Sequence, residues 1–503
     1  MTRAVVVVLL AFAAACARPS SGREQELVDR AVELIGGADR LMSARSLLAE
    51  SEGIEAVLGQ GVTPYGELPT WRLTRRRSVH DLVNGRLRVE QMREPTASSP
   101  EAQPRLERLG LDRTVAYDGT ADGARRAPAA VAAMRRIEML HHPLVLLRAA
   151  VDAQARLTRR RQENGFDVVD LLTAAGDEVT LGFDPAYGTL TMAWSPIADP
   201  ILGDTTIETA FYRYEETGGL GLPRRLVSRI DRYPLRDLRV IRNVLNSDIG
   251  DIAAPAPVRA AAAPPDVPVP NVTTTQVIPH VWRLAGESHH SVLIELADSL
   301  WLFEVPASEE RTLAVIARAR QIRPGKPLTH AIVSHHHFDH LAGLRAAVSE
   351  GLTIVTHRVN EGVVRDLVAR RHRRAPDALE RRPRALQLEL VDANRVLDDP
   401  RNPLFLSKGP ETPHAHGVLV AYLRRGVYTL ADGFRPSHDG PGVVVQADLF
   451  DAAGTSPSLA ARLYDHLITQ SGYTTDSNVV THVPIHGPQL TQADLVSLLP
   501  ATP

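Results

Sequence analysis

The chain has 503 residues, of which 44% are hydrophobic and 23% are charged, and its formal net charge is −2. A chain of this length exceeds what one hydrophobic core usually supports, so we expect two domains. The near-neutral charge excludes a global electrostatic attraction to polyanions, and we predict no nucleic-acid partner.

The first 16 residues have the pattern of an export signal. Arg3 precedes the apolar run "AVVVVLLAFAAA", and Cys16, the only cysteine, follows three alanines. The run is too short to be a good membrane span. It resembles a bacterial lipoprotein lipobox, although Ala13 stands where leucine is usual. The resemblance implies a lipid anchor on Cys16 and a place in the cell envelope, facing the periplasm or the exterior. An ordinary cleaved signal is the alternative.

Residues 23–250 are predicted to form a β-rich α+β domain. The stretch "ELVDRAVELIGGADRLM" indicates a helix interrupted by Gly36 and Gly37. The runs "DVVDLLTA", "EVTLGFD", "GTLTMAW", "TIETAFYRY" and "RRLVSRID", separated by turn residues, are typical of an antiparallel sheet. The main helix candidate is "EMLHHPLVLLRAAV", whose His141 and His142 we interpret as structural. The segments "GGADRL" and "GLGLPRRL" resemble the N-terminal halves of some secreted hydrolases, which implies a domain like a half-barrel.

The amino-acid composition changes at residues 251–270. This segment is rich in alanine and proline and is predicted to be a linker. A buried, proline-rich edge segment is the alternative. Residues 271–503 follow, in which strands such as "SVLIELA", "SLWLFEV" and "LTHAIVS" alternate with helices such as "SEERTLAVIARARQI". This alternation predicts an α/β layered domain. Because 16 of the 19 histidines follow residue 270, imidazole chemistry belongs to this second domain.

The stretch "SHHHFDHLAG" lies between the predicted strand "LTHAIVS" and a predicted helix. Residues two apart in an extended loop face the same way, so His335 and His337 can bind one metal ion. Asp339 and His340, past the bend, can face a second ion. His-x-His-x-Asp-His at a strand–helix junction resembles the signature of the metallo-β-lactamase superfamily, which implies an αββα sandwich for residues 271–503. His336 falls outside this register and is expected to pack or to support its neighbours.

The resemblance also requires a later histidine, an aspartate and a terminal histidine, each at the end of a strand. His414 in "ETPHAHGVLVAYL" is preferred to His416, and His486 in "VVTHVPIHG" is the terminal histidine, with His482 buried in its strand. Asp432 and Asp448 both remain candidates for the aspartate, and the hairpin before Asp432 favours it.

The resemblance therefore assigns two metal ions to the chain. His335, His337 and His414 would bind one ion, and Asp339, His340 and His486 would bind the other, with Asp432 or Asp448 between them. Two zinc ions are expected, although iron and manganese also suit these ligands. No second cysteine is available as a ligand or for a disulfide.

The function that the resemblance implies is metal-dependent hydrolysis of a small molecule. A hydroxide between the metals would attack an ester, thioester, lactone or lactam, and Asp339 would carry a proton to the leaving group. The alternative functional hypothesis is an exported lipoprotein that binds a lipophilic ligand and retains a structural or degenerate metal domain. The sequence gives no indication of the oligomeric state.

Two further features can be interpreted either as functional or as purely structural. His289 and His290, at the start of a strand, either contact substrate or are exposed turn residues. The basic stretch Val363–Leu386 either binds an anionic substrate or lipid headgroups, or is a solvated helix face.

Overall fold

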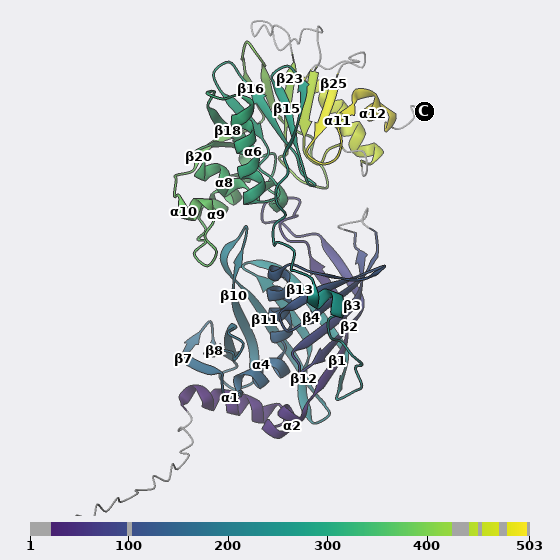
Figure 1. The fold of residues 1–503 in the computed structure, drawn as a ribbon, viewed down its shortest axis with the longest axis vertical. Helices are drawn as coiled ribbons and strands as arrows, with labels where there is room; N and C mark the ends of the chain where they lie inside the picture. Colours follow the sequence, from purple (N-terminus) through teal and green to yellow (C-terminus); the bar gives the residue numbers. More distant parts are fainter. Residues whose placement is uncertain (1–21, 98–102, 425–441, 451–454, 472–479, 500–503) are drawn as a thin grey trace, which may run out of the picture.

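The computed structural model describes residues 22–97, 103–424, 442–450, 455–471 and 480–499. The chain forms a β-rich N-terminal domain and a layered C-terminal domain, stacked along the long axis of the molecule (Figure 1). The predicted signal segment and Cys16 lie outside the described residues. Within the described ranges, no helix is long and apolar enough to cross a membrane.

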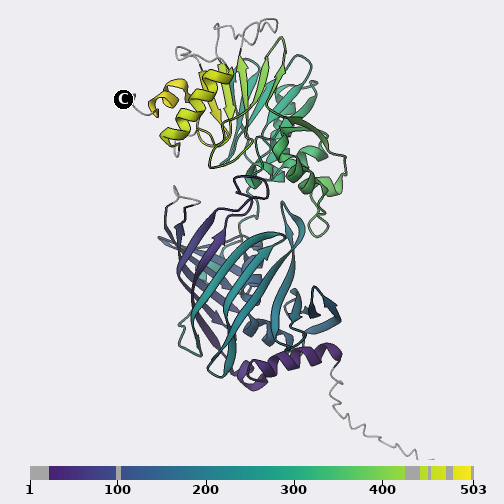
Figure 2. The same cartoon turned by 180° about the vertical axis from the view of Figure 1, so that it is seen from behind.

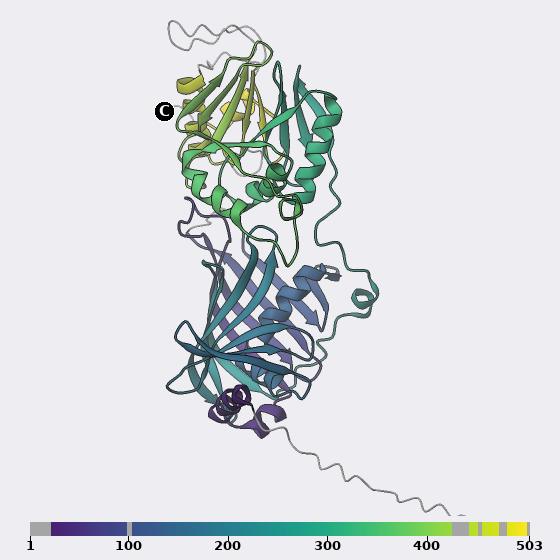
Figure 3. The ribbon, with the colours of Figure 1, turned by 90° about the vertical axis from the view of Figure 1, so that its left-hand side faces the viewer.

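The N-terminal domain is one antiparallel sheet in the order β6-β5-β4-β3-β2-β1-β13-β12-β11-β10-β9-β8-β7. The sheet curves around helices on its inner side (Figures 2 and 3), as expected for a half-barrel. Its strands are β1 Ser46–Ala56, β2 Thr70–Asp81, β3 Arg86–Pro95, β4 Arg105–Asp112, β5 Val115–Thr120, β6 Gly123–Arg126, β7 Arg156–Glu163, β8 Phe166–Leu172, β9 Glu178–Phe183, β10 Leu190–Asp199, β11 Gly203–Thr217, β12 Leu220–Ile230 and β13 Tyr233–Leu245.

Four helices accompany this sheet: α1 Arg23–Leu34, α2 Ala38–Ser43, α3 Ala129–Leu140 and α4 Pro143–Ala150. Gly36 and Gly37, both at positive φ, separate α1 from α2 as predicted. The prediction of one helix over "EMLHHPLVLLRAAV" is wrong. Pro143 disfavours helical backbone at His142, so the chain breaks there and restarts with proline in the first turn of α4.

The C-terminal domain contains two sheets. The first has the order β14-β15-β16-β17-β18-β19-β20, and the second β21-β22-β23-β24-β25-β26. Their strands are β14 Thr273–Ile278, β15 Val281–Ala285, β16 Ser291–Glu295, β17 Leu300–Phe303, β18 Leu328–Ile332, β19 Thr353–His357, β20 Gln387–Val391, β21 Asn394–Leu397, β22 Leu404–Lys408, β23 Leu419–Arg424, β24 Gly442–Gln446, β25 Val480–Pro484 and β26 Leu490–Thr491.

Buried side chains on alternate sides of the strands produce four layers. In β16, Val292 and Ile294 pack between the two sheets, whereas Leu293 packs against the helices outside the first sheet. A third cluster joins the second sheet to α11 and α12. The helices are α6 Glu309–Ile322, α7 Phe338–Leu341, α8 Leu344–Ser349, η1 Arg358–Asn360, α9 Glu361–Ala369, α10 Ala378–Arg381, α11 Pro457–Ser471 and α12 Gln492–Ser497. The domain is therefore an αββα sandwich, as expected.

The predicted linker is partly packed. It contains the short helix α5, Ala256–Ala260. Ala254 and Val258 are buried against Tyr117 of β5, and the Tyr117 hydroxyl donates to the carbonyl oxygen of Ile252. Its first half thus lies on the N-terminal sheet, because the alanine and valine side chains there find an apolar surface to cover.

Candidate metal centre

The candidate ligands lie at the carboxyl ends of strands. Strands β17, β18 and β19 are parallel, and the loop after β18 carries His335 and His337. In the second sheet β24 and β25 are parallel, and Asp448 and His486 follow them. Parallel strands end at one edge of a sheet, so each pair reaches the same rim of the sandwich. The sandwich brings the two rims together.

Two groups of side chains have ligand atoms close enough to hold a metal ion. One consists of His335, His337, His414 and Asp448, and the other of His289, Asp339, His340 and His486. Within each group the ligand atoms all lie within 4.8 Å of one another. These groups contain only imidazole nitrogen and carboxylate oxygen, as expected of a chain with one cysteine.

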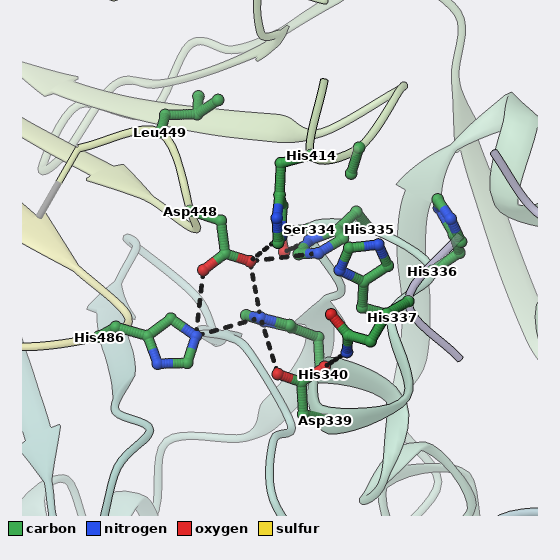
Figure 4. A network of polar contacts seen from close by, with 12 residues as sticks. Ser334, His335, His336, His337, Asp339, His340, His414, Asp448, Leu449 and His486 are labelled. Carbon is green, nitrogen blue, oxygen red and sulfur yellow. Dashed lines mark hydrogen bonds and ion pairs between the residues drawn. The ribbon is translucent and has the colours of Figure 1, made fainter. Parts of the chain in front are cut away.

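The Asp448 carboxylate lies between the two groups (Figure 4). Its Oδ2 is 3.3 Å from Nε2 of His335 and 3.1 Å from Nε2 of His414. The same oxygen is 3.0 Å from Nε2 of His340, and Oδ1 is 3.1 Å from Nε2 of His486. One carboxylate therefore contacts both groups.

The buried nitrogens of the first group fit a cation. Nδ1 of His337 is buried and has no hydrogen-bond partner among the described residues, and Nε2 of His335 is buried 3.3 Å from Oδ2 of Asp448. A buried polar atom without a partner costs free energy, and a metal ion would use both lone pairs. The residues present therefore fit a divalent cation.

The charges of the site also favour a cation. Burial would lower the pKa of His340, but the carboxylates of Asp448 and Glu304 raise that pKa well above its usual value. Burial would raise the pKa of Asp448, but His340 and His335 hold it well below the ordinary range. The metal-free site thus retains a proton on His340 beside an ionised Asp448. Positive charge is stabilised here, whether a proton or a metal supplies it.

Residues behind the ligands fix their orientation. Ser334 Oγ lies 2.9 Å from Nδ1 of His335, and the Ser334 amide donates to the fully buried Glu304. His289 Nδ1 lies 2.7 Å from Ser288 Oγ, while its Nε2 lies 3.2 Å from Oδ2 of Asp339. Such contacts set the tautomer and the ring angle of a metal-binding histidine.

The structure brings together all the described candidates that the sequence analysis assigned as ligands: His335, His337, Asp339, His340, His414 and His486. Asp432 lies outside the described residues. Asp448, the alternative aspartate, occupies the position between the groups. His289, considered only as a substrate contact, belongs to the second group.

Four other histidines lie near the site but belong to neither group. His336 Nε2 contacts the carbonyl oxygen of Gly61, and Nδ1 of His416 lies 3.3 Å from Oε2 of Glu411. His290 Nε2 contacts the Gly487 carbonyl, and His482 is buried against Gln492. None of the four is a ligand candidate among the described residues.

The basic stretch Val363–Leu386 makes ion pairs on its own surface and across to the N-terminal domain. Arg365 pairs with Glu361, and Arg374 pairs with Glu178 of β9. Arg370 contacts Asp231 in the turn between β12 and β13. These pairs favour a structural role for the stretch, part of it at the domain interface.

Sequence reasoning missed two residues of the N-terminal domain, Gln60 and Gly61. Gln60 Nε2 donates to Oδ1 of Asp339, and the carbonyl oxygen of Gly61 lies 3.0 Å from Nε2 of His337. The Gly/Pro-rich turn "VLGQGVTPYGELP" contains no metal-binding or catalytic motif, and Gln60 and Gly61 precede the histidine motif by more than 270 residues. Only the tertiary structure could identify these contacts.

No family model matches the chain, and no curated protein matches it. Solved structures that resemble its C-terminal half include a metallo-β-lactamase from Pontibacter korlensis. That likeness has 15% identity and a TM-score of 0.32, and it covers 45% of this chain and 97% of the other. A metallo-β-lactamase from Hirschia baltica has 15% identity and a TM-score of 0.30, covering 45% and 95%.

Proposed function

We propose that the chain is a metal-dependent hydrolase. The observation that carries the proposal is the position of Asp448 between two complete groups of ligands. His335, His337 and His414 would hold one divalent cation and Asp339, His340 and His486 the other, with His289 beside the second and Asp448 shared. Zinc, two ions per chain, suits this nitrogen and oxygen set, as do iron and manganese. When bound, such a pair supplies an acidified water and Lewis acidity.

Asp339 is the group best placed to move a proton. Its side chain is 37% exposed, so it faces the open side of the centre. Burial would raise its pKa, but His289 and His340 lower it well below the ordinary range, so the carboxylate is ionised at neutral pH. Oδ1 is held by Gln60, which leaves Oδ2 directed toward His289 and His340.

We extend the proposal to a substrate class on the basis of the chemistry that these groups offer. A nucleophilic water beside an ionised carboxylate suits hydrolysis of a small ester, thioester, lactone or lactam. His414 and Asp339 are both more than one third exposed, which leaves a route for the substrate. Export and anchoring through a lipidated Cys16 belong to the same proposal. Cys16→Ser would then move the protein from the membrane fraction to the soluble fraction, and an unchanged membrane fraction would contradict the anchor.

The test combines metal analysis with a substrate panel. The purified protein is expected to hold about two metal ions per chain and to hydrolyse one of the four substrate classes. His335→Ala should lower activity by at least about 100-fold and reduce the metal content, because removing a ligand costs more than removing its supporting contact. His416→Ala, next to the site but outside both groups, is the matched control and should keep both. A folded protein with less than one metal per chain would overturn the proposal.

A cavity in the N-terminal domain favours binding of a lipophilic ligand as a second candidate function. The cavity, about 480 Å³, is lined mainly by apolar side chains of the sheet and of α3. Its lining also includes the buried Arg76, which pairs with Glu138, and Arg236, 2.7 Å from Glu138. Native mass spectrometry should detect a bound lipid if this candidate holds, and an empty cavity in the purified protein would count against it.

A further inference from the structure

The turn between β1 and β2, residues 57–69, reaches from the N-terminal domain to the other domain (Figure 2). Its Gln60 and Gly61 contact Asp339 and His337 of the metal centre. The amide of Phe338 donates to the carbonyl oxygen of Gly59 at 3.3 Å, and the amide of His416 donates to that of Val62 at 2.8 Å. The turn is therefore hydrogen-bonded to two loops that carry ligand candidates, at the residue after His337 and two residues after His414.

The carbonyl oxygen of Gly61 selects one tautomer of His337. It lies 3.0 Å from Nε2 of His337, and a carbonyl can only accept a hydrogen bond. Nε2 must therefore carry the proton, which leaves the lone pair on Nδ1. That Nδ1 is the buried atom without a partner among the described residues, in the group with His335 and His414. The N-terminal domain thus prepares His337 to bind a metal.

The side chain of Gln60 orients Asp339 in the second group. Its amide nitrogen donates to Oδ1 at 2.8 Å, while Oδ2 lies 3.2 Å from His289 and 3.9 Å from His340. A donor on Oδ1 favours the ionised carboxylate and holds Oδ2 toward the neighbouring imidazoles. In each group, therefore, a residue of the N-terminal domain positions one ligand: Gly61 positions His337, and Gln60 positions Asp339.

We infer that Gln60 and Gly61 are positioning residues of the metal centre, so that the N-terminal domain is required for full metal affinity. The inference rests on the proposed function, because it assumes that the two groups bind metal. It goes further in assigning to the N-terminal domain a part in the metal centre itself.

The geometry of Gly59 offers a way to displace the turn. Gly59 has a φ of 72°, and a Cβ there would lie 2.2 Å from Cγ of Phe338. Gly59→Ala must therefore move the turn away from the His337–Phe338–Asp339 segment. Gly85, in the turn between β2 and β3, has a φ of 66° and nothing within 4 Å of an added Cβ. Gly85→Ala imposes similar backbone strain without the clash and is the matched control.

Three variants separate hydrogen bonding by Gln60 from simple packing. Gln60→Met keeps the length of the side chain and loses the donor, Gln60→Glu keeps the shape and replaces the donor by an acceptor, and Gln60→Ala removes the side chain. Each is loaded with Co²⁺, whose absorption spectrum reports the ligand geometry, and its affinity is measured by competition with a chelator. Circular dichroism of the metal-free protein verifies folding.

All three Gln60 variants should bind the second Co²⁺ about 10- to 100-fold more weakly than wild type, with Gln60→Glu at least as weak as Gln60→Ala. Gly59→Ala should weaken both ions and change the spectrum, and Gly85→Ala should match wild type. If wild type binds two ions and the Gln60 and Gly59 variants do so with unchanged affinity and spectrum, this inference fails and the proposed function stands. If folded wild type binds no Co²⁺ or Zn²⁺, both fail.

Discussion

Asp448 combines a strained backbone with a central position among the ligands. Its φ is 58°, in the left-handed region that aspartate tolerates better than most residues. The two residues after Asp448 are anchored because the side-chain oxygen of Gln446, at the end of β24, accepts from the amides of Leu449 and Phe450. A turn held in this way directs the Asp448 carboxylate toward the four histidines that it contacts.

The two aspartates that the sequence analysis left open can be separated by mutation. Asp448→Asn should weaken metal binding by at least about 100-fold, because it removes the carboxylate charge shared by both groups. Asp432→Asn is the matched variant and should bind metal as wild type does. Metal content after gel filtration, with isothermal titration of Zn²⁺ into the metal-free protein, distinguishes them. If Asp432→Asn bound metal more weakly than Asp448→Asn, Asp432 and not Asp448 would be the bridging aspartate.

At the scale of elements, the break between α3 and α4 places histidines inside the N-terminal domain. His141 Nδ1 lies 2.9 Å from Thr209 Oγ1 and its Nε2 lies 2.9 Å from Ser195 Oγ. Burial lowers the pKa of His141 to about 3, and burial also lowers the pKa of His142 to about 3 and that of His80 to about 4. The folded domain therefore holds these imidazoles neutral.

This burial predicts acid sensitivity of the N-terminal domain. Below a pH of about 6.5 these histidines bind protons in the unfolded chain but stay neutral in the folded state. The free energy of unfolding therefore falls as the pH drops from about 6.5 toward the lowered pKa values of the folded state. Each such histidine removes about 1.4 kcal/mol per pH unit from the free energy of unfolding in this range. Urea unfolding of the metal-free protein between pH 7 and pH 5 measures the slope.

His141→Gln should lessen that slope, because glutamine can bond both hydroxyls and does not titrate. His416→Gln, at an exposed histidine paired with Glu411, is the control and should leave the slope unchanged. Equal slopes for wild type and His141→Gln would contradict the interpretation.

At the scale of the whole molecule, charged contacts hold the two domains against each other. Arg370, after α9, is mostly buried, with Nη2 2.8 Å from Asp231 and 3.2 Å from Asp366. Its Nη1 also donates to the carbonyl oxygen of Leu202 at 3.1 Å, and Arg232 pairs with Asp366 at 2.7 Å. Because the turn with Gln60 reaches the metal centre from the same domain, these contacts help to keep it in place.

Arg370→Met should loosen the interface. The loss of a charged hydrogen-bond network is expected to cost about 1–3 kcal/mol, to separate the unfolding of the two domains and to weaken metal binding. Arg365→Met is the matched control, because Arg365 lies on α9 and, within the described part of the chain, pairs with Glu361 one turn away, an interaction of about 0.2–0.5 kcal/mol. Differential scanning calorimetry and small-angle X-ray scattering measure both effects. A single, unshifted transition in Arg370→Met would exclude this role.

The sequence by itself determined the local features of this protein. Strand-like runs and turn residues predicted β8 to β12 of the N-terminal domain, but β1 to β7 and β13 were not predicted. The alternation of strands with helices predicted an α/β layered C-terminal domain, and the resemblance of the histidine motif implied the αββα sandwich. The run from Ser334 to Gly343 identified the metal-binding loop because its chemistry is contained within ten consecutive residues. The break of the helix at His142 was missed, although Pro143 was a signal for it.

Only the tertiary structure decided which distant groups meet. The place of Asp448 depends on a left-handed turn after β24. His289, which precedes β16, joins the second group because it contacts Asp339 and the ring of His486. The contacts of Gln60 and Gly61 depend on the docking of one domain against the other. A hydrogen bond between residues far apart in the chain leaves no local pattern, because its geometry is set by packing and not by sequence spacing.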